Sequence, residues 1–91
     1  MLPQDPQKRK QIPIYSGFIN YFPDAIIEVT KLSVAGSKQH HPDAKLHWDK
    51  DKSGDELDAM MRHLLEKDYA SVAWRAMANL QREIEKNGKQ I

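Results

Sequence analysis

The chain contains no cysteine in its 91 residues. Disulfide cross-links and thiolate metal sites are therefore excluded as sources of stability. A single domain of this length buries only about 60–65% of its unfolded surface, so it is marginally stable as a monomer. Because cross-links cannot supply the missing stability, we expect the chain to assemble into a homo-oligomer.

A clear excess of charge of one sign is also missing. The chain has 14 basic and 13 acidic side chains and a net charge of +1. Proteins that bind nucleic acid or membrane surfaces through charge usually show a basic excess, so we expect neither partner. No apolar run approaches the ~18 residues of a membrane span, and the N-terminus lacks the apolar segment of a signal peptide. We therefore expect a cytoplasmic protein.

Three helices are indicated by their end signals and by the spacing of apolar residues. The first is expected over 23–35, with proline at its first position and Gly36 as its stop. The second is expected over 54–67 and the third over 69–86, with Asp68 as the N-cap of the third. Since almost nothing separates the last two, they form a tight hairpin or one kinked helix.

The apolar residues predict which helix faces are buried. On the first helix, Ala25, Val29 and Leu32 form one stripe. Ile27 and Val34 lie nearly opposite, so this helix is apolar on two faces and its second partner is expected to be another subunit. The stripe of the second helix is Leu57, Met60, Met61, Leu64 and Leu65. The stripe of the third is Tyr69, Val72, Ala73, Ala76, Met77, Leu80 and Ile84.

The first 22 residues differ in composition from the rest. Residues 1–13 hold three prolines and the basic run 8–10, which is typical of an extended arm. We therefore predict an all-α protein with two parts. Residues 1–22 form an extended N-terminal arm, and residues 23–91 form a small helical-hairpin or bundle domain that is completed by oligomerisation.

The stretch 49–60, DKDKSGDELDAM, has acids spaced as in a calcium-binding EF-hand loop. Such a loop needs a bidentate glutamate at its twelfth position, and here that residue is Met60. We therefore expect no tight calcium binding. Ser53 and Glu56 instead match the S-x-x-E capping box at the start of a helix.

Two carboxylates at the edges of the apolar stripes are candidate metal ligands. Packing of the first two helices by their stripes would bring Glu28 and Asp58 together. Carboxylates close to a core repel unless a cation or proton intervenes, and Mg²⁺ would hold them together with a phosphate. In the alternative interpretation Glu28 pairs with Lys31 and Asp58 with Arg62 on exposed helix surfaces. The spacing alone favours this alternative.

The polar loop 37–52 supplies a second possible metal site. His40, His41 and His47 lie in it with Asp43 and Asp49, a composition that suits a transition metal. Long loops of this kind are often functional.

Other side chains are candidate contacts for a nucleotide. Trp48 beside His47 could stack on a base, whereas Trp74 is expected in the core or an interface. Arg75 is a candidate phosphate contact. His63 flanks the second apolar stripe and is either a hydrogen-bonded structural residue or a phosphate or base contact.

An ordered series of segments covers nearly the whole chain from Arg9 to Glu85: RKQIPIYSG (9–17), YFPDAIIEV (21–29), KLSVAG (31–36), QHHP (39–42), LHWD (46–49), KSGDELDAMMRHLL (52–65) and VAWRAMANLQREIE (72–85). This series resembles a phage-associated family, the dATP/dGTP diphosphohydrolase N-terminal family. The resemblance implies a distant relation to the all-α, MazG-like nucleotide pyrophosphohydrolases. Those enzymes pair an E-x-x-E helix with an E-x-x-D helix around Mg²⁺ and cut a dNTP to dNMP and pyrophosphate.

The resemblance places the second acidic motif at Asp55 and Asp58, as D-x-x-D, and only partly matches the first at Asp24 and Glu28, which are four apart. It implies Mg²⁺-dependent pyrophosphohydrolysis of purine (deoxy)nucleoside triphosphates in the cytoplasm of a phage-infected bacterium. The implied catalytic residues are Glu28, Asp55, Asp58 and His63, the first three as metal ligands. The expected nucleotide contacts are His47, Trp48, Lys52, Arg62 and Arg75.

Two alternatives to an enzyme remain. The chain could be a phage nucleotide-binding protein that sequesters a nucleotide signal of host defence and performs no chemistry. It could also be a small structural or interaction module without a ligand.

Overall fold

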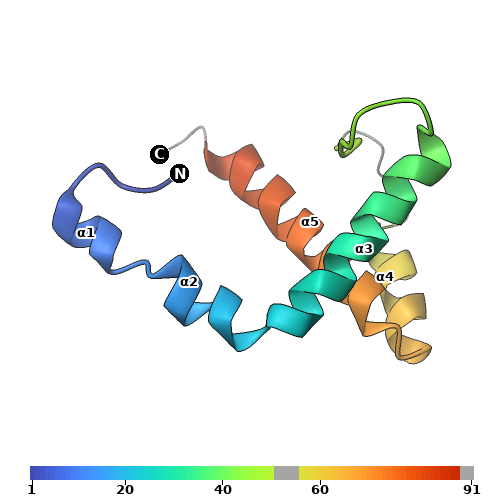
Figure 1. Cartoon of the computed structure of the whole chain (residues 1–91), viewed down its shortest axis with the longest axis horizontal. Helices are drawn as coiled ribbons and strands as arrows, with labels where there is room; N and C mark the ends of the chain where they lie inside the picture. The colour runs from blue at the N-terminus through green and yellow to red at the C-terminus, as the bar shows by residue number, and fades with distance from the viewer. Residues whose placement is uncertain (51–55, 89–91) are drawn as a thin grey trace.

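The computed structural model describes residues 1–50 and 56–88, and every regular element in these ranges is helical (Figure 1). This confirms the predicted all-α class. The elements in chain order are α1 (Pro6–Lys10), α2 (Ile14–Gly17), the 3₁₀ helix η1 (Ile19–Tyr21), α3 (Pro23–His40), α4 (Glu56–Leu65) and α5 (Tyr69–Gly88).

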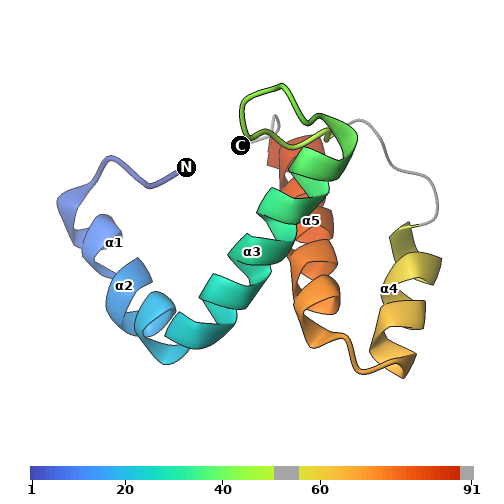
Figure 2. The ribbon, with the colours of Figure 1, turned by 45° about the vertical axis from the view of Figure 1, so that its right-hand side comes forward.

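The segment before α3 lies apart from the other helices. In Figures 1 and 2, α1 and α2 lead away from α4 and α5, and the segment joins the body through η1 at the start of α3. It contains short helices where an extended arm was predicted. Asp5 explains the first of them, because its carboxylate accepts a hydrogen bond of 3.0 Å from the Lys8 amide and Pro6 follows at the first helical position.

Helix α3 continues five residues past the predicted end at Ala35. Gly36 lies inside the helix without a positive φ, and a Cβ at this position would meet nothing within 4 Å. A glycine within a helix costs only about 1 kcal/mol relative to alanine, which an 18-residue helix tolerates. The helix is capped instead at His41, whose amide donates to the Ser37 carbonyl at 2.8 Å.

The predicted tight turn between the last two helices is present. Lys67 adopts a left-handed φ of 60°, and Asp68 then caps α5. Its carboxylate accepts hydrogen bonds from the Ser71 hydroxyl at 2.7 Å and from the Ser71 amide at 3.3 Å. These two bonds, in that order, lower the pKa of Asp68 below its usual 3.8. The cap predicted from sequence is therefore confirmed.

Helix α5 lies between the other two long helices. It packs against α4 on one side and α3 on the other, whereas α3 and α4 make no contact within the described ranges (Figure 2). The most buried side chains are small: Ala59 on α4 and Ala78 on α5 are each 4% exposed, and Ser71 is also buried. These contacts form a thin core centred on α5.

The faces that pack inside the chain are not the predicted apolar stripes. On α5 the buried and half-buried face contains Ser71, Arg75, Ala78 and Arg82, which recur at helical spacing. Helical geometry places the predicted stripe on the opposite face, and its larger members are exposed: Tyr69, Met77, Leu80 and Ile84. On α4, Ala59 is buried, whereas the exposed residues include Leu57, Met61, Leu64 and Leu65. As a description of packing within one chain, the stripe prediction was wrong for α4 and α5, whereas on α3 Val29 is half-buried and Leu32 lines the space facing α5.

Candidate functional site

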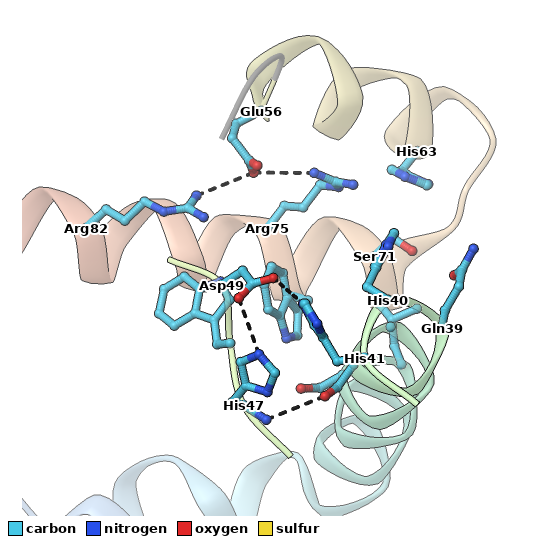
Figure 3. Close-up of a pocket in the computed structure, with 16 residues that line it drawn as sticks. Gln39, His40, His41, His47, Asp49, Glu56, His63, Ser71, Arg75 and Arg82 are labelled. Carbon is cyan, nitrogen blue, oxygen red and sulfur yellow. Dashed lines mark hydrogen bonds and ion pairs between the residues drawn. The ribbon is translucent and has the colours of Figure 1, made fainter. Parts of the chain in front are cut away.

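A cleft of about 460 Å³ lies where the C-terminal half of α3 faces α5 (Figure 3). The loop that follows α3 forms one wall, and α4 contributes two side chains to the rim. The polar packing face of α5 forms the floor, which explains why polar side chains occupy that face. The aromatic and charged side chains of the lining include His41, His47, Trp48, Asp49, Arg75 and Arg82.

Two histidines and an aspartate from the loop meet at the wall of the cleft. Nε2 of His41 lies 2.5 Å from one carboxylate oxygen of Asp49, and Nε2 of His47 lies 3.3 Å from the other. The two imidazole rings are 4.6 Å apart between centroids. One ligand atom from each residue lies within 4.8 Å of the others, so the three could hold one metal ion. Figure 3 shows both rings directed at the Asp49 carboxylate.

The end of this loop is fixed to α5 by several contacts. Trp48 packs edge-on against Trp74, with 5.6 Å between ring centroids. The ammonium of Lys50 lies 2.8 Å from the Glu85 carboxylate, and this bond, followed by one from Gln81, lowers the pKa of Glu85. Arg82 donates from Nε to the Lys50 carbonyl at 3.2 Å, and its guanidinium lies 5.1 Å from the centre of the Trp48 ring. These contacts hold the end of the loop against α5.

Glu56 and two arginines form the other charged group of the cleft. Its carboxylate accepts a hydrogen bond of 3.3 Å from Arg75 and lies 3.5 Å from Nη1 of Arg82 (Figure 3). The Glu56 side chain is 18% exposed. The Nη1 atom of Arg82 is buried and makes no hydrogen bond to any described residue, although it is within ion-pair distance of Glu56. One carboxylate thus faces two guanidinium groups, leaving this end of the cleft electropositive.

The structure brings together several residues that the sequence marked for a nucleotide. His47, Trp48, His63 and Arg75 all line the cleft. His63 has the structural contact that was weighed for it, since its Nδ1 lies 3.1 Å from the Asp68 carboxylate.

Other predicted site residues are not in the cleft. Glu28 is exposed on α3, 3.3 Å from Lys31. Asp58 is exposed on α4, and because α3 and α4 do not touch within the described ranges, the two acids do not meet in one chain. Arg62 lies on α4 outside the cleft lining. Asp55 and Lys52, together with Ser53 of the predicted capping box, lie outside the described residues.

Sequence reasoning did not assign a site role to Glu56 or Arg82, and it placed Trp74 in a core or interface. A signal was present: Ser71, Arg75, Ala78 and Arg82 recur at i, i+4, i+7 and i+11, which is a small and polar face of one helix. Such a face normally points to solvent, and only its contact with α3 and α4 makes it the floor of a cleft.

Comparisons with protein families, with curated proteins and with solved structures found no match to this chain. In the part that the structure describes, no helix is long and apolar enough to cross a membrane.

Proposed function

We propose that this protein binds a purine nucleoside triphosphate in the cleft between α3 and α5. The observation that carries the proposal is the meeting, in one cleft, of Trp48 from the loop with Trp74, Arg75 and Arg82 of α5. Aromatic faces suit a base, and guanidinium groups suit phosphates. A volume of about 460 Å³ lies within the usual range of small-molecule sites, ~300–1,000 Å³.

The base would be held at the loop side of the cleft. Trp48 and Trp74 are both half-buried and meet edge to face. Because Arg82 and Lys50 lie over the Trp48 ring, at 5.1 and 5.3 Å, a base would stack on Trp74 or displace one of these cations from Trp48. Stacking of a base on an aromatic ring contributes about 1–3 kcal/mol. His47 also lines the cleft beside Trp48, and because its Nδ1 is engaged by the Lys45 carbonyl it would contact the base through its ring face.

The phosphates would lie near Arg75 and Arg82. Glu56 neutralises only part of their charge, and the buried Nη1 donor of Arg82 lacks a hydrogen bond in the described chain. Both side chains keep exposed surface, 30% for Arg75 and 22% for Arg82, and planar guanidinium groups can bind phosphate in a bidentate manner. We propose Mg²⁺ as the ion that accompanies the triphosphate, because it binds phosphate oxygens and keeps several waters.

Hydrolysis is the second candidate, and the family resemblance supports it. Water would attack the α-phosphorus, the bond from that phosphorus to the β-bridging oxygen would break, and the products would be a nucleoside monophosphate and pyrophosphate. A site for such chemistry usually contains several carboxylates. Within the described lining only Asp49 and Glu56 are acidic, and both face cationic or imidazole groups. This acid-poor lining favours binding without turnover.

The two tryptophans give a direct test, since they are the only ones in the chain and both line the cleft. Titration with dATP, dGTP, ATP, GTP and cyclic nucleotides in Mg²⁺ should change the intrinsic fluorescence, and chromatography of the same mixtures reports any product. Arg75→Gln should weaken binding at least about 10-fold, as expected for a charge-assisted contact of ~1.5–3 kcal/mol. Arg9→Gln on α1 is the matched control. Unchanged fluorescence with every nucleotide, or equal affinity in Arg75→Gln, would refute the proposal.

We further propose that the functional form is a homo-oligomer, completed through the exposed apolar faces of α4 and α5. The chain has 7891 Å² of accessible surface, whereas a compact monomer of 10.5 kDa has about 5,400 Å². Its radius of gyration is 15.4 Å, compared with about 12 Å for a compact domain of this length. Part of the excess of roughly 2,500 Å² per chain belongs to the segment before α3, and the whole is of the size of a large, obligate type of interface.

A second copy of the chain is the occupant that we propose for these faces. The larger residues of the apolar stripes of α4 and α5 are exposed, and exposed apolar faces are typical of association between identical subunits. Helix α3 adds exposed Ile27, one of the residues whose position predicted a partner.

A further inference from the structure

We propose that His41, His47 and Asp49 form a binding site for one divalent transition-metal ion of the zinc class. Two imidazole nitrogens and a carboxylate suit zinc, cobalt or iron better than Mg²⁺, which prefers oxygen ligands. This site is separate from the Mg²⁺ that accompanies a nucleotide, and the argument for it does not depend on the nucleotide proposal.

The state of His47 is fixed by its backbone. Its Nδ1 lies 2.8 Å from the carbonyl oxygen of Lys45, and a carbonyl can only accept, so Nδ1 carries the proton. In the neutral ring Nε2 then presents its lone pair, and it does so 3.3 Å from an oxygen of Asp49. Two lone pairs at this distance repel unless a proton or a cation lies between them. A hydrogen bond from the distal nitrogen to a backbone carbonyl is also the usual support of a metal-binding histidine.

One of the separations already matches that between two ligands of a metal ion. Ligands bonded at about 2.0–2.1 Å in a tetrahedral arrangement lie roughly 3.3–3.4 Å from one another. The distance from His47 to Asp49 is 3.3 Å. His41 shares a hydrogen bond with the other oxygen of Asp49 at 2.5 Å. A metal ion in place of the shared proton would widen the separation between these two atoms. His40, although adjacent in sequence, does not belong to the group.

Contacts within the chain position the three candidate ligands. His41 is the C-cap of α3. The amide of His47 donates to the Ser37 hydroxyl at 3.4 Å, and Asp49 lies between two residues, Trp48 and Lys50, that dock on α5. Because the donors are positioned in advance, little ordering is lost when an ion binds.

Three protein ligands leave a coordination position open, as in catalytic rather than structural zinc sites. All three residues line the cleft, so the open position is available to a water or to an anionic oxygen of a ligand. An ion held by these residues would supply a Lewis acid at the loop wall of the cleft, beside the α5 floor that carries the arginines.

The test is titration of the chelator-treated full chain with Co²⁺ alone, in the absence of nucleotide. We expect one ion per chain, visible d–d absorption typical of low coordination number, and displacement by Zn²⁺ but not by excess Mg²⁺. His41→Ala and His47→Ala should each weaken Co²⁺ binding at least about 100-fold, a loss at or above that seen for second-shell changes. His40→Ala is the matched control and should bind like the unmodified chain.

Circular dichroism shows whether each variant retains its helices. If a variant unfolds, X-ray absorption of the zinc-loaded unmodified chain supplies the second measurement, with scattering from two imidazoles expected. The proposal is overturned if the unmodified chain does not bind Co²⁺, if His40→Ala loses binding as much as His47→Ala, or if zinc shows no imidazole scattering. Nucleotide binding in Mg²⁺ alone is measured separately, so failure of either proposal leaves the other testable.

Discussion

Leu80→Asp is the sharpest test of assembly, because Leu80 lies in the middle of the exposed stripe of α5. Its exposed fraction is 56% in one chain. Full burial of a leucine contributes about 1.5–3 kcal/mol, so covering the remaining surface contributes roughly 0.8–1.7 kcal/mol per copy. In a twofold-symmetric dimer the same residue is buried twice, which gives roughly 2–3 kcal/mol.

This loss corresponds to a dissociation constant raised about 30- to 150-fold, and the introduced charge adds a desolvation penalty. Sedimentation velocity from roughly 1 to 100 µM should therefore show the unmodified chain as an oligomer and Leu80→Asp as mostly monomer. Gln81→Asp is the matched control, since Gln81 is exposed on the same helix but about 100° from Leu80.

A monomeric unmodified chain at all these concentrations would contradict the assembly proposal. So would equal sedimentation of Leu80→Asp and the unmodified chain, because an exposed position on a monomer tolerates substitution within about 0.5 kcal/mol.

Three further predictions concern charged side chains. Asp68→Asn should lower the melting temperature at neutral pH. Because the pKa of Asp68 is lowered in the folded state, the stabilisation by its carboxylate is present above pH 3.8 and is lost as the pH falls through the lowered pKa. The difference in melting temperature between the unmodified chain and the variant should therefore close in acid. A constant difference down to the acid limit would contradict this assignment. Glu56→Gln should reduce the free energy of unfolding, measured in urea, by about 1–2 kcal/mol. The same change should strengthen phosphate binding, because Arg75 and Arg82 lose their carboxylate partner. Weaker phosphate binding would count against an arginine phosphate site. Asp58→Asn should change the free energy of unfolding by no more than about 0.5 kcal/mol and should leave the tryptophan fluorescence response to nucleotide unchanged. Loss of Mg²⁺-dependent hydrolysis in this variant would instead show that Asp58 belongs to a catalytic site.

The local structure of the body could be read from its sequence because the signals are local. Pro23 begins α3 and Asp68 caps α5. The turn before Asp68 is short, as expected from the small separation between the two apolar patterns. Two local errors have simple causes. Gly36 was taken as a stop although a helix tolerates a single glycine. Asp5 with Pro6 is a helix start that the surrounding prolines obscured.

The arrangement of helices could not be read in the same way. Hydrophobic periodicity tells which face avoids water, but it does not tell whether that face meets the same chain or another copy. The inference that Glu28 and Asp58 meet depended on packing by the apolar stripes within one chain, and α3 and α4 do not touch in the described ranges. The candidate metal ligands were recognised in the loop, yet the choice of His41, His47 and Asp49 over His40 and Asp43 needed the geometry of the cap.

One face of α5 lines the cleft and the opposite face is the proposed contact with a second copy, and a substitution can test whether the two faces act independently. Arg75, Ala78 and Arg82 form the cleft side, whereas Leu80 and Ile84 point the opposite way. A second copy on the apolar face would therefore leave the cleft open. Leu80→Asp should accordingly dissociate the oligomer and still bind one Co²⁺ per chain, provided that circular dichroism shows intact helices. Loss of Co²⁺ binding in a folded, monomeric Leu80→Asp chain would mean that the partner subunit shapes the loop of His41 and Asp49, and that the site of a single chain is incomplete.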